Sequence, residues 1–359
     1  MKILTRYLAR EFVQYFFLGL GAFSAIYLIV EFFERINAFM YNKAPWAMIG
    51  AYFLNKFPSI LFQVTPAAIL LASIITLGVM SRHNEVIAIK SGGIGLGFLV
   101  YPILGVVILV FVGLLGLSEY LMPWSNQNAR AIYGVIVHKK KSAATFKQSQ
   151  LWIHGRQSIY NIQLYHPDRN VLEGLTIYRF SPGYALVQRI DARSAQWKEG
   201  KWVLSGASVT DFDPQGVPAR NDFPELILSL PETPSDFQIA EKNPNEMNFR
   251  QLREYVQKIE RDGYDARKYR TAMHGAISFP FTVIIMACLG IPLALRSERG
   301  AGLARGIGYS IFISFLYLVV YSFILELGKG GSFPPFLAAW LANFIFAMVG
   351  VYLLLSVRH

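Results

Sequence analysis

The sequence predicts an α+β membrane protein, with six transmembrane helices and one β-rich insert between the third helix and the fourth. Of its 359 residues, 53% are hydrophobic and only 16% are charged, whereas an ordinary soluble domain carries about 25% charged residues. Six apolar runs are long enough to cross a bilayer, since about 20 residues at 1.5 Å per residue suffice. The stretch 150–230 instead contains short alternating runs separated by turns.

The six apolar runs are connected by short loops, except where the insert lies. The expected spans are Phe12–Val30, Phe57–Met80, Ile94–Ser118, Ala276–Leu295, Ile307–Leu325 and Phe333–Ser356. Tyr41–Trp46 has the character of an interfacial turn, because Pro45 interrupts a helix and aromatic residues favour headgroup depth. Leu121–Ser125 is expected to end the third span.

The insert is expected to fold as an all-β sandwich followed by one helix. Its β-branched and alternating runs recur with the spacing of a sandwich; they are Ser158–Tyr165, Leu175–Phe180, Tyr184–Ile190, Lys201–Leu204 and Glu225–Leu230. The helix Asn248–Asp262 carries a cap pair, Asn248 and Gln251, and an apolar stripe of Leu252, Val256 and Ile259. The chain thus divides into residues 1–124, 125–270 and 271–359.

Orientation follows from Lys and Arg in the short loops, because cytoplasmic loops carry an excess of them. With the N-terminus inside, the cytoplasmic segments carry nine basic residues: Lys2, Arg6, Arg10, Arg82, Lys90, Arg296, Arg299, Arg305 and Arg358. The opposite face, outside the insert, carries only Arg35, Lys43, Lys56 and Lys329. Both termini are therefore expected in the cytoplasm and the β-rich insert on the other side.

The stretch Ser81–Gly93 is a short polar segment between the second and third spans. Thirteen residues suffice for one helix at the membrane surface, with Val86 and Ile89 on one face and Gly92 with Gly93 as its end. Two interpretations stay open from spacing alone: a solvated loop, and a docking element for a cytoplasmic partner.

Several functional motifs are missing from the sequence, and their absence narrows the classes of function that we expect. None of the six spans carries an ionisable residue near its middle, although ion-coupled transporters need such residues at depth. No G-x-x-x-x-G-K-[ST] loop is present, and the six histidines and the single Cys288 suggest no local metal site. The net charge of +11 is dispersed over span ends rather than gathered as a nucleic-acid surface. An enzyme, a cofactor in this chain and a nucleic-acid partner are not expected.

Aromatic residues crowd the first and fifth spans, and a few charges lie near their outer boundary. The aromatic residues include Phe16, Phe17, Phe23, Tyr27, Tyr309, Phe312, Phe315, Tyr317 and Tyr321. They suit either lipid-facing bulk or a lining for acyl chains. The group Glu31, Glu34 and Arg35 and the pair Glu119 and Arg130 could meet anionic headgroups or form ion pairs, and on sequence alone we favour ion pairs.

Several motifs resemble one known family over essentially the whole chain. They are R-Y-L-A-R-E at 6–11, S-R-H-N-E-V-I-A-I-K-S-G-G at 81–93, M-P-W-S-N-Q-N-A-R at 122–130, D-G-Y-D-A-R-K-Y at 262–269 and F-P-F at 279–281. With the order of spans and insert, they resemble the LptF/LptG permeases of the lipopolysaccharide export transporter. The motif at 262–269 and G-S-F-P-P-F-L-A-A-W at 331–340 look closer to the LptG branch.

The resemblance implies one half of an ATP-driven exporter in the cell inner membrane. A second permease of LptF type (or of LptG type) and an LptB-type ATPase dimer, which holds ATP and Mg, would be partners. Lipopolysaccharide would be extracted from the membrane and passed through a periplasmic β-jellyroll to LptC and LptA. The segment 81–93 would be the coupling helix, with Arg82, Glu85, Val86, Ile89 and Gly92 facing the ATPase or the membrane helices.

The resemblance also implies lateral gates to a lipid cavity at the first and fifth spans. The corresponding substrate-binding candidates are Tyr27, Glu31, Arg35, Arg130, Phe312, Phe315, Tyr317 and Tyr321. Family members carry several lysines after the first span, where this sequence has Glu31, Glu34 and Arg35, so Arg35 and Arg130 are the phosphate candidates. The alternatives are an LptF-type subunit, a non-transporting scaffold with a periplasmic β domain, and an ion-coupled lipid carrier.

Overall fold

A computed structural model describes most of the chain, in two compact units. The described residues are 2–93, 95, 97–138, 151–154, 158–166, 170–181, 183, 185–198, 200–212, 218–228, 230, 243–261, 265–296 and 302–356. The helical unit comprises residues 1–139, 244–255 and 267–359, and the β unit comprises residues 140–243 and 256–266. The segment 244–255 thus belongs with the helices, although it follows the strands in sequence.

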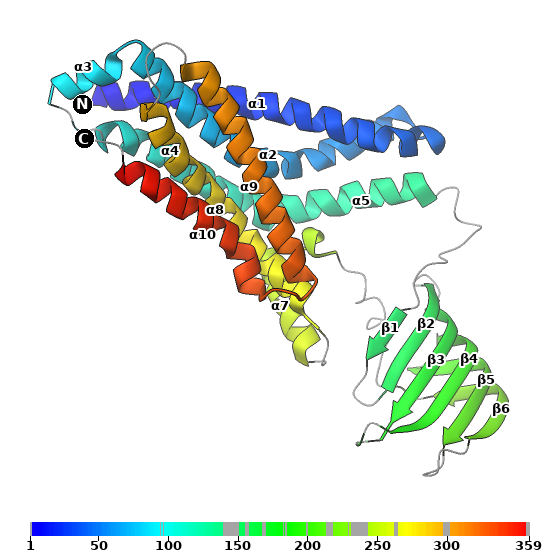
Figure 1. Cartoon of the computed structure of the whole chain (residues 1–359). Helices are drawn as coiled ribbons and strands as arrows, with labels where there is room; N and C mark the ends of the chain where they lie inside the picture. Colours follow the sequence, from blue (N-terminus) through cyan, green and yellow to red (C-terminus); the bar gives the residue numbers. More distant parts are fainter. Residues whose placement is uncertain are drawn as a thin grey trace. The chain divides into compact units, whose positions relative to one another are not determined.

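Six helices of the first unit are long and apolar enough to cross a membrane, as the sequence predicts (Figure 1). They are α1 (Lys2–Tyr41), α2 (Trp46–Arg82), the continuous α4–η1–α5, α8 (Arg267–Arg296), α9 (Gly302–Lys329) and α10 (Pro335–Leu355). The apolar window of α2 is 83% buried, against 22% for α1 and for α9. Helix α2 is therefore the centre of the unit, while α1 and α9 leave broad apolar faces exposed.

The third span does not end at Leu121–Ser125, and this expectation was wrong. Helix α4 (Gly97–Gly116) passes into a π-helical turn, η1 (Leu117–Leu121), and continues as α5 (Met122–His138). Proline lacks an N–H and its ring clashes with the carbonyl four residues earlier. The wide turn avoids a break, because the Met122 N–H bonds the Leu117 carbonyl, five residues back, just before Pro123.

Aromatic residues from the C-terminal end of α1 and the N-terminal end of α2 form a cluster with α5. Phe39 and Tyr52 are buried there and pack on Phe53 and Tyr133, with ring centroids 5.3 to 6.3 Å apart. The chain turns at 42–45 between α1 and α2, as the residues Tyr41–Trp46 predict, and Pro45 precedes the first residue of α2. At 1.5 Å per residue, the 40 residues of α1 span about twice the thickness of a hydrocarbon core.

The strands of the β unit form one six-stranded antiparallel sheet in chain order. They are β1 (Leu151–His154), β2 (Ser158–His166), β3 (Val171–Phe180), β4 (Leu186–Lys198), β5 (Lys201–Phe212) and β6 (Pro218–Leu228). Strands β4 and β5 are longer than predicted because Arg, Asp, Ser and Gln alternate with their buried residues. All six belong to this single sheet among the described residues, and a two-layered jellyroll stays a prediction.

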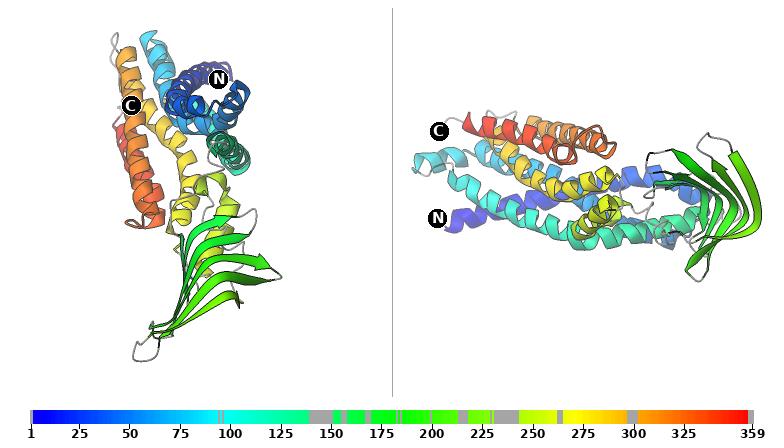
Figure 2. Two further views of the ribbon diagram at one scale, coloured as in Figure 1. Left: turned by 90° about the vertical axis from the view of Figure 1, so that its right-hand side faces the viewer. Right: turned by 90° about the horizontal axis from the view of Figure 1, so that it is seen from below.

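The sheet bends along one row that crosses its central strands. Side chains of one face normally recur every second residue, but the buried pairs here are three apart: Leu172 and Leu175, Ala192 and Ala195, Leu204 and Ala207. Gly174 and Gly206 lie between the members of two of these pairs and adopt φ values of +63° and +62°, which glycine allows. Because the spacing at this row is three residues instead of two, the buried side chains change from odd to even positions, or the reverse, and stay on the same face of the sheet. Figure 2 shows the curvature of the sheet.

Helix α7 (Phe249–Arg261) confirms the predicted helix and its cap. The Asn248 N–H donates to Gln251 Oε1 over 3.1 Å, and the Gln251 N–H donates to Asn248 Oδ1 over 2.8 Å. These reciprocal bonds satisfy two N–H groups that the helix itself leaves without acceptors. The predicted stripe of Leu252, Val256 and Ile259 is buried.

Candidate functional site

The polar stretch Ser81–Gly93 folds into one short helix, α3 (Glu85–Ser91), as predicted. Helix α2 ends at Arg82, and Asn84 adopts a φ of 57°, which separates α2 from α3. The Ala88 N–H then bonds the Asn84 carbonyl over 2.9 Å. At the other end, Gly93 adopts a φ of +74° and no side chain crowds the exit. The two glycines end α3 where the sequence predicts.

The two faces of α3 differ in burial. Val86 is buried in the same apolar core as Leu8 and Phe12 of α1, and Ile89 packs against that core. Arg82, Ile87 and Gly92 are exposed. The Glu85 side chain is 34% exposed and has its Oε1 3.9 Å from His83 Nδ1. Val86 and Ile89 therefore attach α3 to the membrane helices. Ile87 and Ala88 are exposed, and the partly exposed Glu85 also interacts with Tyr7 of α1.

Glu31 is the centre of a polar cluster on α1. Its side chain is buried, and its Oε1 accepts a hydrogen bond from the Tyr52 hydroxyl over 3.1 Å and pairs with Arg35 Nε at 3.4 Å. Tyr27, one turn earlier, donates to Gln63 Oε1 of α2 over 3.0 Å. A buried carboxylate is costly unless it is paired and hydrogen-bonded. The ion-pair interpretation of Glu31 and Arg35 is confirmed, with the Glu31 carboxylate buried and Arg35 partly exposed.

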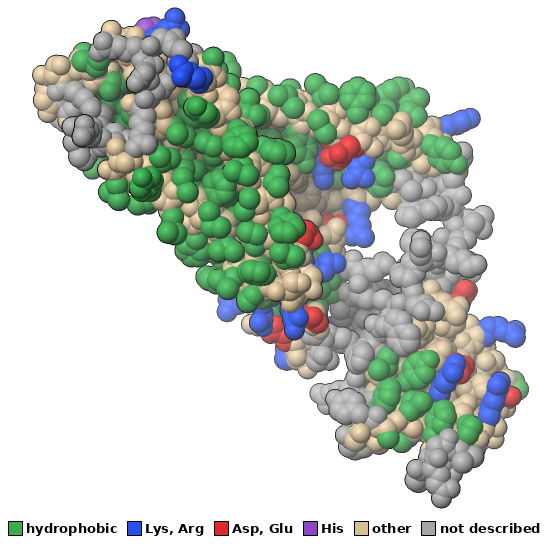
Figure 3. All heavy atoms as spheres, viewed as in Figure 1, with side chains coloured by type: hydrophobic (Ala, Val, Ile, Leu, Met, Phe, Trp, Pro, Cys, Tyr) green, Lys and Arg blue, Asp and Glu red, His purple; other side chains and the backbone are tan. Residues whose placement is uncertain are grey.

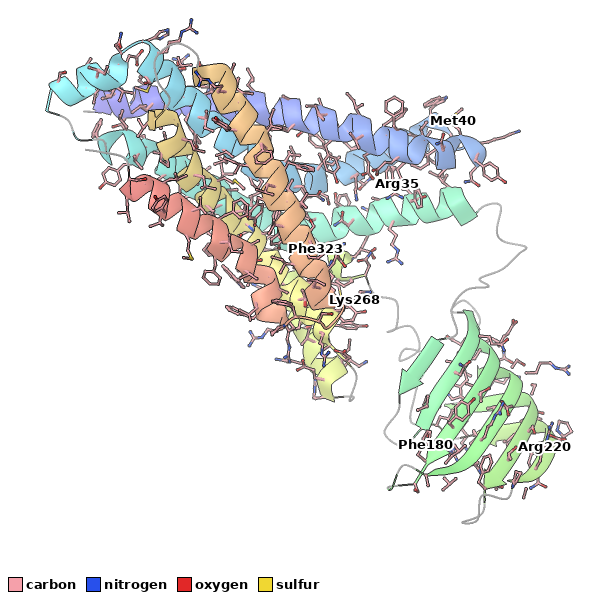
Figure 4. All side chains as sticks on the ribbon, viewed as in Figure 1. Arg35, Met40, Phe180, Arg220, Lys268 and Phe323 are labelled. Atoms are coloured by element: carbon pink, nitrogen blue, oxygen red, sulfur yellow. The ribbon has the colours of Figure 1, made fainter. Side chains whose placement is uncertain are left out.

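Arg35 projects from α1 towards α5 (Figure 4). Its guanidinium carbon lies 5.1 Å from the centre of the Tyr133 ring, a distance at which the ring face attracts a cation. The Arg35 side chain is nevertheless 38% exposed. It is therefore oriented by Glu31 and Tyr133 and still offers N–H donors at the surface of the helical unit.

The predicted pairing of Glu119 with Arg130 was wrong. Arg130 Nη1 instead contacts Glu246 Oε1 at 2.9 Å, and Glu119 Oε1 lies 3.6 Å from Arg250 Nε. Glu119 and Arg130 are eleven residues apart on one helix, whereas side chains on a helix surface meet at spacings of three or four. Both partners come from the segment that follows the β strands. Arg130 is thus committed to a contact within the chain.

The aromatic candidates on α9 divide into two groups. Phe312 and Phe315 are 62% and 65% exposed, on a face where Figure 3 shows a nearly continuous apolar surface. Tyr317 and Tyr321 point the other way and are buried. The Tyr317 hydroxyl lies 2.6 Å from both Thr282 of α8 and Asn343 of α10. The two tyrosines join α8, α9 and α10, so we do not include them in a lipid-contacting surface.

No group of three or more histidine, cysteine, aspartate or glutamate side chains that could hold a metal ion occurs in the described part of the chain. Charged side chains instead gather towards the ends of the helices, and apolar side chains cover the faces between them (Figure 3). Six such helices around a buried α2 define a polytopic membrane protein.

Comparison with known proteins identifies the family. Residues 6–356 match the model of the lipopolysaccharide export system permease LptF/LptG, so the chain belongs to this family. It is similar to the lipopolysaccharide export system permease protein LptG of Escherichia coli strain K12, with 19% identity and 98% of each chain covered. The protein of the same name from Escherichia coli O6:H1 strain CFT073 gives the same values. The chain is an inner-membrane permease of the lipopolysaccharide export system.

Sequence reasoning missed the contacts of Glu119, Asn126, Gln127 and Arg130 with residues 245–250. The partners are separated by 116 to 131 residues, so no helical period relates them. The sequence did contain one indication of these contacts. The motif at 122–130 includes the polar residues Asn126, Gln127 and Arg130, which an apolar membrane span does not require.

Proposed function

We propose that this chain is the LptG-type permease subunit of an ATP-driven exporter that extracts lipopolysaccharide from the inner membrane. The observation that carries the proposal is the construction of α3. Val86 and Ile89 hold it in the apolar core of the helical unit, Arg82 and Ile87 beside them are exposed, and the Glu85 side chain is 34% exposed. Such a helix is suited to receive a separate ATPase dimer that binds ATP and Mg. This chain itself contributes no nucleotide-binding loop.

The lipid would lie against the exposed faces of α1 and α9. Phe312 and Phe315 are available to acyl chains. Arg35 is the candidate for a phosphate, because its guanidinium is oriented by Glu31 and Tyr133 and remains partly exposed. Guanidinium groups suit phosphate recognition since their N–H donors match its oxygen atoms. A second permease of LptF type would complete the cavity.

The β unit would receive the lipid in the periplasm and pass it to the bridge proteins LptC and LptA. Its position is supported by the nine basic residues of the short loops on one side of the membrane against four on the other. Both termini and α3 would then be cytoplasmic, on the side where the ATPase and its nucleotide are found. The name LptG of the two Escherichia coli relatives supports the LptG branch.

Glu85→Ala tests the proposal directly. The permease pair and its ATPase are reconstituted in lipid vesicles, and lipopolysaccharide release and ATP hydrolysis are measured. We expect the variant to insert and assemble in the membrane but to lose most ATP-dependent release, because a charged contact to the ATPase is removed. Glu254→Ala is the matched control, since Glu254 is an exposed glutamate on α7, away from α3.

Three results would contradict the proposal. Unchanged release by the Glu85 variant would remove α3 from the coupling role. A wild-type complex that holds no ATPase and no glycolipid after purification would instead indicate a scaffold. Release that collapses with the proton gradient at constant ATP would indicate an ion-coupled carrier.

A further inference from the structure

The segment Pro244–Arg250, which we call the strap, carries the chain back from the β unit into the helical unit. It begins with a short 3₁₀ turn, η3 (Pro244–Glu246), and ends in the first turn of α7. Two amides of α5 bind its backbone: Asn126 Nδ2 donates to the Asn245 carbonyl over 2.8 Å, and Gln127 Nε2 donates to the Glu246 carbonyl over 2.8 Å. These contacts fix the main chain of the strap on α5.

Charged side chains secure the strap on either side of these amides. One turn along α5, Arg130 Nη1 contacts Glu246 Oε1 at 2.9 Å. On the other side, Glu119 Oε2 accepts the Phe249 N–H over 3.0 Å, and Glu119 Oε1 lies 3.6 Å from Arg250 Nε. Phe249 is the first residue of α7, so its N–H has no acceptor within that helix. Glu119 caps α7 from another helix.

The contacts continue from α5 into the centre of the helical unit. Asn126 Oδ1 accepts a hydrogen bond of 2.6 Å from Ser59 Oγ on α2, and Ser59 is 4% exposed. Asn126 therefore uses both ends of its amide, one towards α2 and the other towards the strap. The motif M-P-W-S-N-Q-N-A-R at 122–130 gains a physical role, because three of its side chains hold residues more than 100 positions away.

The two chain segments that flank residues 140–243 of the β unit consequently meet the same helix. The chain leaves the helical unit after His138, at the end of α5, and first returns on the strap, which is bound along α5; residues 256–266 also belong to the β unit. A displacement of the third span would move both attachment points together. A single attachment would instead allow the β unit to swing about one linker.

We propose that Glu119, Asn126, Gln127 and Arg130 form a closed joint that transmits movement of the third span to the β unit during export. The proposal rests on the export function proposed above. In it, the four residues act as positioning residues and do not contact the lipid. The joint stays closed throughout the cycle, because an open joint would take from Glu119 and from the Phe249 N–H the hydrogen bond that joins them.

Charge reversal tests the joint in the reconstituted exporter. Arg130→Glu and Glu246→Arg each place like charges together, and we expect lipopolysaccharide release to fall about tenfold while ATP hydrolysis is retained. The thermal unfolding midpoint should fall only slightly, because the Arg130 side chain is 53% exposed. The double variant restores the opposite pair and is expected to recover release. Arg253→Glu, the same change at an exposed site of α7 outside the strap, is the control.

A disulfide tests whether the joint stays closed. Asn126→Cys with Asn245→Cys, on a Cys288→Ser background, replaces the amide contact by a covalent bond, so release should be retained in the oxidised form and should fall on reduction, when the contact of Asn126 with the strap is missing. Three results overturn the proposal. The first is unchanged release by both single charge variants. The second is a loss of release that is matched by equal losses of ATP hydrolysis and of stability, and the third is a block of release by the disulfide. A wild-type exporter that shows no ATP-dependent release contradicts the proposed function instead.

Discussion

Helix α3 and the strap are both short polar segments attached to the membrane helices, but they are attached in opposite ways. Helix α3 is held by apolar contacts of Val86 and Ile89, and beside them Arg82 is exposed and Glu85 partly exposed. The strap is held by hydrogen bonds and ion pairs, with Glu119 and Arg130 directed at it from the third span. The difference indicates which segment binds a partner protein. Polar groups of the strap form hydrogen bonds and ion pairs within the chain, so the strap is a joint, whereas α3 presents exposed side chains and is a docking face.

The largest effect is expected from Val86→Asp, which breaks the attachment of α3. The variant would bury a carboxylate among Leu8, Phe12 and Met80, which costs several kcal/mol because the charge lacks a partner. We expect a lower thermal unfolding midpoint and loss of the bound ATPase on purification.

Ile87→Asp is the matched control for Val86→Asp, because Ile87 is the neighbouring residue and is 43% exposed. The unfolding midpoint should change little, while ATPase binding is weakened. Equal destabilisation by the two variants would contradict the division of α3 into an attached face and a docking face.

Glu119→Ala should produce the next largest effect. The variant leaves the Phe249 N–H without its acceptor and Arg250 without its partner. Hydrogen bonds to charged groups contribute about 1.5 to 3 kcal/mol, and we expect a loss of stability in this range. Amide hydrogen exchange at residues 249–251 should become faster, with α9 unaffected. Unchanged exchange at these positions would show that Glu119 does not cap α7.

Asn248→Ala removes one half of the capping box at the strap end of α7. The Gln251 N–H loses its 2.8 Å acceptor, and substitution of an N-cap residue by alanine costs about 1 kcal/mol. Gln257→Ala, an exposed position in the middle of the same helix, is the control. Equal shifts in the unfolding midpoint for the two variants would remove the capping argument.

The smallest effect is expected from His83→Ala. Its imidazole is 63% exposed and lies 3.9 Å from Glu85, and exposed ion pairs contribute about 0.2 to 1 kcal/mol. The unfolding midpoint should be close to that of the wild type at pH 6 and at pH 8. A clear loss of stability would mean that this pair, rather than Val86, fixes α3.

Features set by local sequence were predictable. The six spans follow from runs of apolar residues, the end of α3 from Gly92 and Gly93, and the cap of α7 from Asn248 and Gln251. Each depends on residues within a few positions of one another, so composition and spacing contain the necessary information.

Features set by contacts between distant elements were not predictable. Pro123 indicates a break, and only the π-helical turn before it allows the helix to continue. The burial of Tyr317 and Tyr321 could not be inferred, because α9 is apolar on all sides and its pattern does not separate lipid from protein. The strap contacts join residues far apart in the chain, which no local pattern records.

Cross-linking from α3 to the ATPase tests the central claim most directly. A single cysteine replaces Ile87 on α3 or, as a still more exposed comparison, Phe312 on α9, each on a Cys288→Ser background. The assembled exporter is then treated with a short thiol-to-amine cross-linker. The account predicts an adduct with the ATPase chain from position 87 and none from position 312. An active complex with no adduct at position 87 would contradict the docking role of α3.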